Sequence, residues 1–224
     1  MSALFRRRLP PECRQGATHF EARNLSACFC VLSAPALADD PGIKGATIAD
    51  WDYWRETVAA GHEVGPHGHA HEFYGRMDLD TARRSIESCW QTFERELPGF
   101  DRRSSIFHVP YLSAPDELVR WIGQQSLGAR LVCGGEGLNT MTIPVGNPID
   151  CICFGPHEVG AAANQRLSRF RYETGWLVFV FHGIDDEGWG PITSGELEIL
   201  VDSALSANML IAPPSRLLRI ARLE

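Results

Sequence analysis

Apolar runs that alternate with helical patterns constrain the fold of this chain most strongly. Short apolar runs predict strands at 26–33, 62–65, 105–109, 130–133, 149–154, 176–182 and 209–212. Helical spacing predicts helices at 48–60, 78–96, 114–125 and 195–207, and a short helix near the end of the chain. Continuously apolar strands that alternate with helices are typical of a parallel sheet covered by helices. About seven such repeats in one domain favour a (β/α) barrel over an open sheet.

Length and composition exclude several classes of protein. The 224 residues suffice for one domain, 1–224, and a net charge of −7 argues against nucleic acid as the main partner. The sequence contains no apolar window of about 20 residues, so we expect no membrane-spanning helix. The first residues lack the apolar core of a signal peptide, so we expect a cytoplasmic protein. The sequence leaves the oligomeric state, including a homo-oligomer, open.

Seven cysteines are scattered along the chain, and four of them form two C-x-C pairs. Cys28 and Cys30 lie in one apolar run, and Cys151 and Cys153 lie in another. In a strand, each pair points to one face, and buried free thiols are common in protein cores. We therefore expect core thiols, with a metal or redox role as the alternative.

Three histidines within five residues mark a candidate metal site. His67, His69 and His71 directly follow the predicted strand at 62–65. Imidazole is a common zinc ligand, and a helical turn at this point would bring His67 and His71 to one side. His69 would then point away from the metal, toward residues that support the ligands or toward the surface. The alternative is a solvated loop rich in histidine.

Other polar residues follow the apolar runs in the same way. They are His108 with Tyr111, Asp150, and His182 with Asp185. In a parallel barrel, the residues at the C-terminal ends of the strands share one rim, where barrel enzymes carry their chemistry. We therefore expect these side chains to converge with His67 and His71.

These motifs, in their order and spacing, resemble the polysaccharide deacetylase (NodB-homology, carbohydrate esterase family 4-like) family. The His-x-x-x-His metal pair of that family, after Gly-His-Glu-Val-Gly, is similar to 61–71, and its Ala-Thr-Phe-Phe-Val strand is similar to 27–31. Its Arg-x-Pro-Tyr motif resembles 108–111, with His108 in place of Arg, and its apolar strand ending in His resembles 177–182. The resemblance covers about 22–218 and implies a distorted, NodB-type (β/α) barrel of about seven parallel strands.

The resemblance also implies a chemistry. A divalent metal, with zinc first and cobalt, manganese or nickel as alternatives, would be held by His67, His71 and a carboxylate. The metal would polarise an N-acetyl carbonyl and activate water. The backbone N–H of Tyr111 would stabilise the oxyanion, and His182 would protonate the leaving amine as general acid.

Some of these residues have alternative interpretations. His182 could be a hydrogen-bonded rim histidine without a catalytic role. Asp150 could be a carboxylate that supports the residues of the catalytic site from behind, or only a cap. His108 replaces the motif arginine poorly, because arginine is always charged and fork-shaped.

The first motif of the family, Thr-Phe-Asp-Asp-Gly, has no counterpart in this chain. It supplies the general base and the third metal ligand, and it should fall where the chain reads Phe5-Arg6-Arg7-Arg8. Cations cannot ligate a metal ion and would repel one, and Glu12 beside two prolines is the nearest carboxylate. Residues 1–21 are thus atypical. Codons can be chosen for 6–13 that encode Asp-Asp-Gly in another reading frame, so we consider a local frameshift as the origin of this segment.

Two functions compete. The first is a metal-dependent hydrolase that removes acetyl groups from N-acetylated carbohydrate or a small amide, by hydrolysis of a C–N bond other than a peptide bond. The second is a catalytically inactive relative with a carbohydrate-binding or interaction role, favoured by the loss of both aspartates. An unrelated metal-dependent barrel hydrolase is disfavoured by the ordered motifs.

Overall fold

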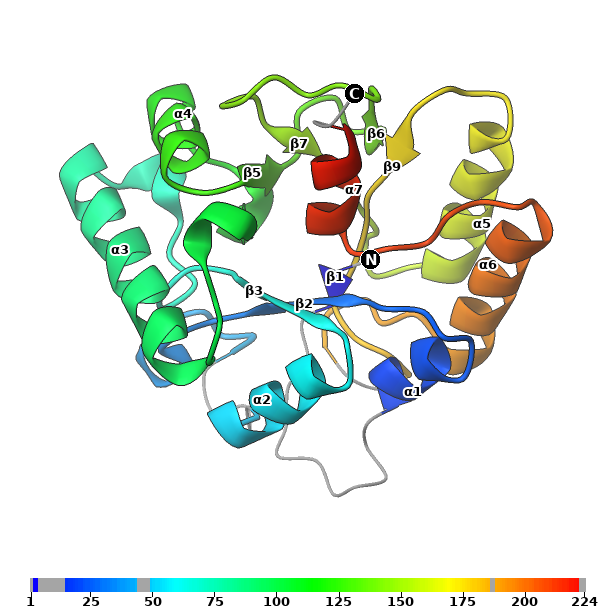
Figure 1. Cartoon of the computed structure of the whole chain (residues 1–224), viewed down its shortest axis with the longest axis horizontal. Coiled ribbons are helices and arrows are strands. Elements are labelled where there is room, and N and C mark those ends of the chain that lie inside the picture. Colours follow the sequence, from blue (N-terminus) through cyan, green and yellow to red (C-terminus); the bar gives the residue numbers. More distant parts are fainter. Residues whose placement is uncertain (1, 4–14, 44–48, 186–187, 222–224) are drawn as a thin grey trace.

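A computed structural model of the chain describes residues 2–3, 15–43, 49–185 and 188–221 (Figure 1). The helices are α1 Gln15–Glu21, α2 Trp51–Ala59, α3 Leu79–Glu96, α4 Asp116–Gln125, α5 Val159–Phe170, α6 Ser194–Ser206 and α7 Pro214–Ala221. The strands are β1 Ser2–Ala3, β2 Cys28–Val31, β3 Glu63–Pro66, β4 Ile106–His108, β5 Gly128–Leu131, β6 Leu138–Asn139, β7 Ile149–Asp150, β8 Ile152–Cys153, β9 Trp176–Leu177 and β10 Phe179–Phe181.

Parallel pairing dominates the sheets. One sheet has the order β3-β2-β1-β10-β8 and a second has the order β4-β5-β7, and all their pairs are parallel. Strands β7 and β8 are separated only by Cys151, so the segment 149–153 takes part in both sheets. A short antiparallel pair, β6 with β9, completes the strands of the described ranges. The predicted α/β fold with a parallel sheet is confirmed.

The gap between the two parallel sheets lies between β3 and β4. These strands approach closely, since a Cβ atom on Gly65 would lie 2.7 Å from Nε2 of His108. No ladder of backbone hydrogen bonds joins β3 to β4 in the described part of the chain. The closed barrel therefore stays a prediction.

The side chains of the strands divide between two cores. Alternation along β2 sends Phe29 and Val31 into the larger core, which the strands share with the helices. The smaller core includes Ile106 and Val180 from the strands and Leu218 from α7. Figure 1 shows the helices around the strands, with α3 and α4 on one side and α5 and α6 on the other. No helix in the described ranges is both long and apolar enough to cross a bilayer.

Most of the predicted elements are present, with shifted ends. The helix expected at 78–96 is α3, and the carboxylate of its N-cap Asp78 accepts a hydrogen bond from the backbone N–H of Thr81. The strand expected at 209–212 is wrong, because this segment forms no strand. Its alternating Met209 and Ile211 pack against the larger core, and Pro213 and Pro214 follow directly. The alternation therefore reflects packing of an extended segment without a paired neighbour.

Candidate active site

His67 lies directly after β3, at the C-terminal end of the parallel sheet. Its backbone N–H donates to the carbonyl of Val31 over 2.8 Å and so extends the pairing with β2. Its Nδ1 lies 2.8 Å from the backbone carbonyl of His108, a contact that requires the hydrogen on Nδ1. Burial, and then the neighbouring His71, lower the pKa of His67 well below its ordinary value. The ring is therefore neutral, with its lone pair on Nε2.

His71 meets His67 by a different route from the one expected. The chain between them is an irregular loop and not a helical turn, with positive φ at Gly68 and at His71. The two rings nevertheless lie with their centroids 5.2 Å apart. Nδ1 of His71 lies 2.8 Å from Oδ2 of Asp40. A hydrogen on Nδ1 again places the lone pair of the neutral ring on Nε2.

The loop that carries both histidines is fastened to its neighbours. The carboxylate of Glu72 accepts hydrogen bonds from the backbone N–H of Ala70 and from the hydroxyl of Ser85 on α3. Gly68 must be glycine, because its φ is +90° and a Cβ atom there would lie 2.9 Å from Pro110. His69 points elsewhere, with Nδ1 2.7 Å from the hydroxyl of Ser33. This agrees with its interpretation as a residue outside the pair.

Asp40 contributes a carboxylate to this site that the sequence motifs did not predict. Its Oδ2 also accepts a hydrogen bond from the hydroxyl of Tyr111 over 2.8 Å, and its Oδ1 accepts from the N–H of Gly42 over 2.7 Å. Burial opposes its ionisation, but the donors Tyr111 and Gly42, together with His71, hold the pKa of Asp40 below its ordinary value. Asp40 follows the apolar run at 26–33, so the rule that function gathers at the C-terminal ends of strands could have found it.

Tyr111 covers the histidine pair from the β4 side. Its ring centroid lies 4.6 Å from that of His71, and its side chain is 48% exposed. Burial and the Asp40 carboxylate raise the pKa of Tyr111 to about 12, so the phenol stays protonated near neutral pH. Tyr111 and Leu112 both have positive φ, a conformation that is costly for large side chains and that clusters at functional sites.

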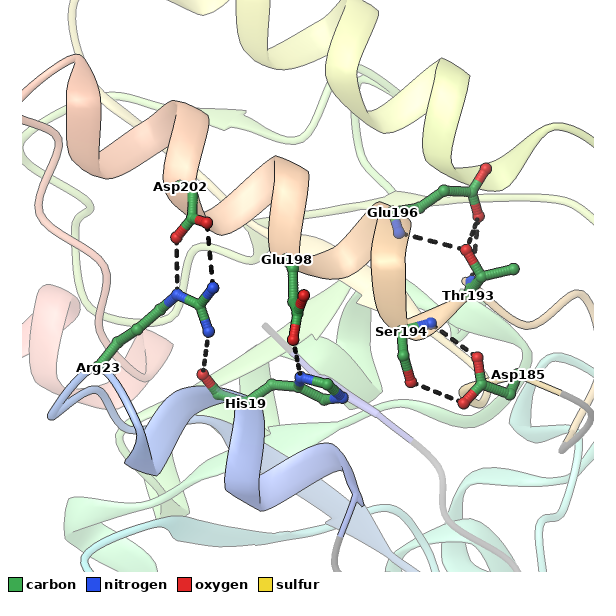
Figure 2. Close-up of polar contacts among 8 residues, drawn as sticks. All are labelled: His19, Arg23, Asp185, Thr193, Ser194, Glu196, Glu198 and Asp202. Carbon is green, nitrogen blue, oxygen red and sulfur yellow. Dashed lines mark hydrogen bonds and ion pairs between the residues drawn. The ribbon is translucent and has the colours of Figure 1, made fainter.

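His182 belongs to a second group of residues, after β10. Its ring nitrogens lie 3.7 and 3.8 Å from the sulfur of Cys153, and its ring packs edge-on against Trp189 at 5.2 Å. Asp185 anchors this segment, because its carboxylate accepts from the N–H and the hydroxyl of Ser194 (Figure 2). His182 thus contacts Cys153 and Trp189, whereas His71 contacts Asp40 and Tyr111 and lies beside His67.

His108 is fully buried beneath the pair. Its side chain is 0% exposed, and its backbone carbonyl accepts the hydrogen bond from Nδ1 of His67. Nε of Arg130 donates to Nδ1 of His108 over 2.8 Å. Because Nδ1 accepts, the hydrogen of the neutral ring lies on Nε2, which faces the sulfur of Cys28 at 3.4 Å.

Two buried thiols share this cluster. Cys28, Cys30 and His108 offer ligand atoms that all lie within 4.8 Å of one another, a set that could hold a metal ion. The hydrogen on Nε2 of His108 and the fixed charge of Arg130 disfavour a metal in this arrangement. Burial opposes ionisation of Cys30, but the hydrogen bonds of Cys28 and His108 and the charge of Arg130 hold the pKa of Cys30 well below its ordinary value.

Asp150 anchors a loop. Its carboxylate accepts hydrogen bonds from the backbone N–H groups of Cys133 and Gly137, over 2.7 and 3.1 Å. These contacts agree with the cap that we gave as its alternative role. Arg6, Arg7 and Glu12, which bear on the missing first motif, lie outside the described residues.

The chain is similar to a known protein family. A family model described as polysaccharide deacetylase matches residues 12–132, more than half of the chain. A comparison with curated protein sequences finds no match.

Solved structures share the fold at low sequence identity. Peptidoglycan deacetylase PdaC from Bacillus subtilis is 15% identical over 99% of this chain and 91% of its own, with a TM-score of 0.58. A family 4 acetyl xylan esterase from Clostridium thermocellum, in complex with a cobalt ion, is 16% identical over 98% of this chain and 90% of its own, with a TM-score of 0.57. BA3943 from Bacillus anthracis, a CE4 family pseudoenzyme, is 15% identical over 97% of this chain and 65% of its own, with a TM-score of 0.61.

The family match covers the strand β2, the histidine pair and Tyr111, and it begins after the three arginines. On this match, and with a parallel α/β fold that agrees with it, the chain belongs to the polysaccharide deacetylase family.

Proposed function

We propose that this chain is a metal-dependent hydrolase that removes acetyl groups from N-acetylated carbohydrate. The observation that carries the proposal is the paired orientation of His67 and His71. Each ring donates from Nδ1, one to a backbone carbonyl and one to a carboxylate, as metal-binding histidines commonly do. With both Nδ1 atoms engaged, the rings, whose centroids lie 5.2 Å apart, would offer their Nε2 atoms to one divalent ion.

The residues around the pair have separate roles in this proposal. When bound, a divalent ion, with zinc first and cobalt, manganese or nickel as alternatives, would polarise the acetyl carbonyl and activate water. The backbone N–H of Tyr111 would donate to the oxygen that gains charge as water adds to the carbonyl carbon. As the C–N bond breaks, His182 would give a proton to the leaving nitrogen. His108 and Asp150 would position backbone groups without touching the substrate.

Exposed aromatic rings support carbohydrate as the substrate. Trp189 beside His182 is 53% exposed and Tyr111 beside His71 is 48% exposed. Such rings offer flat apolar faces against which a sugar ring can pack, with polar edges for hydrogen bonds.

One observation favours the second candidate function, a catalytically inactive member with a carbohydrate-binding or interaction role. Hydrolysis needs a base to take the proton of water, and the family motif that supplies it reads Arg6-Arg7 here. Arginine is always protonated in proteins and cannot accept that proton. BA3943, with a similar fold, is a pseudoenzyme, and a mutant of it has restored enzymatic activity.

The metal content of the purified chain tests the proposed site. We expect about one divalent metal per chain by elemental analysis, lost in His67→Ala and in His71→Ala because two ligands are needed to hold it. His157→Ala, at an exposed histidine, is the matched control and should keep the metal. Metal retained in His67→Ala would show that the site lies elsewhere.

Activity then separates the two candidate functions. Release of acetate from an N-acetylglucosamine oligomer by the metal-loaded chain, absent in His182→Ala, would support the hydrolase. A folded chain that binds metal but releases no acetate would support the inactive member. In that case, the double variant Arg6→Asp and Arg7→Asp should gain activity, because it supplies the base and a third ligand.

A further inference from the structure

The carboxylate of Asp40 contacts three groups, two of them from distant parts of the chain. Its Oδ2 lies 2.8 Å from Nδ1 of His71 and accepts from the hydroxyl of Tyr111 over 2.8 Å, while Oδ1 accepts from the N–H of Gly42. The side chain of Asp40 is 18% exposed and that of His71 is 12% exposed. Hydrogen bonds in such a partly buried place are screened less by water than bonds at the surface.

A neutral histidine carries one hydrogen, and its neighbours decide which nitrogen holds it. A carboxylate beside Nδ1 accepts only when the hydrogen is on Nδ1, so Asp40 selects the form of His71 with its lone pair on Nε2. For His67, the same choice is made by the backbone carbonyl of His108, which no side-chain substitution removes. A substitution of Asp40 can therefore change which ring nitrogen of His71 carries the hydrogen, whereas no such side chain acts on Nδ1 of His67 through this contact.

The carboxylate is itself held from both sides. Gly42 fixes one oxygen and Tyr111 fixes the other, so the group cannot turn away from His71 without losing a hydrogen bond. The same contact holds the tyrosine ring over His71 at 4.6 Å. Because its contacts are made on the Nδ1 side of His71, Asp40 acts through the histidine.

We infer that Asp40 is a positioning residue that fixes His71 with its hydrogen on Nδ1, so that Nε2 faces the metal, and that holds Tyr111 in place over the ring. The part of this inference that concerns the metal rests on the proposed function. The part that concerns the hydrogen on Nδ1 is a property of the metal-free protein.

Nitrogen NMR of the histidine rings tests the inference without any metal. In the metal-free wild-type chain, above the ordinary pKa of histidine, the shifts and ring couplings of His71 should show the hydrogen on Nδ1. In Asp40→Asn they should move toward a mixture of the two forms, because a neutral amide holds that hydrogen less strongly. Asp39→Asn removes the same charge one residue away and should leave His71 unchanged. A hydrogen on Nε2 in the wild type, or no change in Asp40→Asn, would overturn the inference.

A second variant separates the two contacts of Asp40. Tyr111→Phe removes one hydrogen bond to the carboxylate but leaves its contact with His71. The hydrogen of His71 should therefore stay on Nδ1. If Tyr111→Phe changes the ring nitrogen signals as much as Asp40→Asn does, the effect comes from general disturbance of the loop and the assignment to Asp40 is wrong.

Cobalt affinity tests the link to the metal. Asp40→Asn should weaken Co²⁺ binding by about 10–100-fold in a competition titration, the range found for partners of metal-bound histidines. Asp39→Asn should bind as the wild type does. An unchanged affinity in Asp40→Asn, with binding abolished in His67→Ala, would leave the proposed function standing and overturn this inference. If the wild type binds no Co²⁺, the proposed site fails, and the NMR result alone decides the role of Asp40.

Discussion

Burial and the neighbouring His71 together set the protonation state of His67. His67 is 4% exposed, and burial, followed by the proximity of the His71 imidazole, lowers the pKa of His67 well below its ordinary value. A lowered pKa keeps the imidazole neutral, and only the neutral ring has a lone pair to offer a metal. The same shift lowers the free energy of unfolding in acid, because His67 binds a proton more strongly in the unfolded chain than in the folded one.

This difference in proton binding predicts how stability changes with pH. In the metal-free protein, the contribution of His67 is fully present above the unfolded pKa of about 6.5 and is lost as pH falls from there toward the lower folded pKa. One proton corresponds to a slope of at most about 1.4 kcal/mol per pH unit. Denaturant unfolding at a series of pH values, with a chelator, should show this slope in the wild type and a shallower one in His67→Asn. Equal slopes in the two proteins would contradict the role given to His67.

At the scale of elements, α6 contacts both the segment after His182, through Asp185, and the region of α1. Its start carries a capping box, in which Thr193 accepts from the N–H of Glu196 and the Glu196 carboxylate accepts in return from the N–H of Thr193. Further along, Glu198 and Asp202 contact His19 and Arg23, near or just after the end of α1 (Figure 2). The helix therefore links the segment after His182 to the N-terminal part of the described chain.

The capping box predicts a measurable loss. Thr193→Ala removes the side-chain acceptor of the first turn, so it should lower the free energy of unfolding by about 1 kcal/mol, within a range of about 0.5–2. Ser206→Ala, at the exposed end of the same helix, should change it by less than about 0.5 kcal/mol. Chemical denaturation of the three proteins gives the comparison. A loss in Thr193→Ala no larger than that in Ser206→Ala would show that the cap contributes nothing.

The predicted helix α3 and the unpredicted helix α5 differ in how clearly their local sequence indicates a helix. Helix α3 has an unbroken apolar stripe and an aspartate at its N-cap, so its local pattern agrees with its structure. Helix α5 was missed, since its residues 159–170 include two glycine or serine positions and a polar run, and its N-cap Glu158 has positive φ. Its contacts with the larger core, through Val159, Ala163 and Leu167, supply what its local pattern lacks.

At the scale of the whole molecule, α7 packs its apolar side into the smaller core. Leu218 is 0% exposed and joins the cluster that contains Ile106 and Ile149 from two strands. Ser215, at the start of the helix, hydrogen-bonds to Glu63 of β3, and burial raises the pKa of Glu63 above its ordinary value. The last described helix thus ties the two parallel sheets together.

Truncation of Leu218 tests this role. Leu218→Ala should lower the free energy of unfolding by about 2–5 kcal/mol, because it leaves a cavity between the strands. Ile220→Ala, at a side chain 40% exposed on the same helix, should cost much less. Both values follow from denaturant unfolding. Similar losses in the two variants would mean that Leu218 does not pack in the smaller core.

The sequence by itself determined the class of fold, the helix α3, the strand β2 and the histidine pair, because each is written in residues close together along the chain. Only the tertiary structure decided that Asp40 faces His71, that Arg130 lies behind His108, and that His182 groups with Trp189. Asp40 and His71 are 31 residues apart, and Arg130 and His108 are 22 apart. Such pairs are set by how strands are ordered and how loops fold over their ends, and no local periodicity records that information.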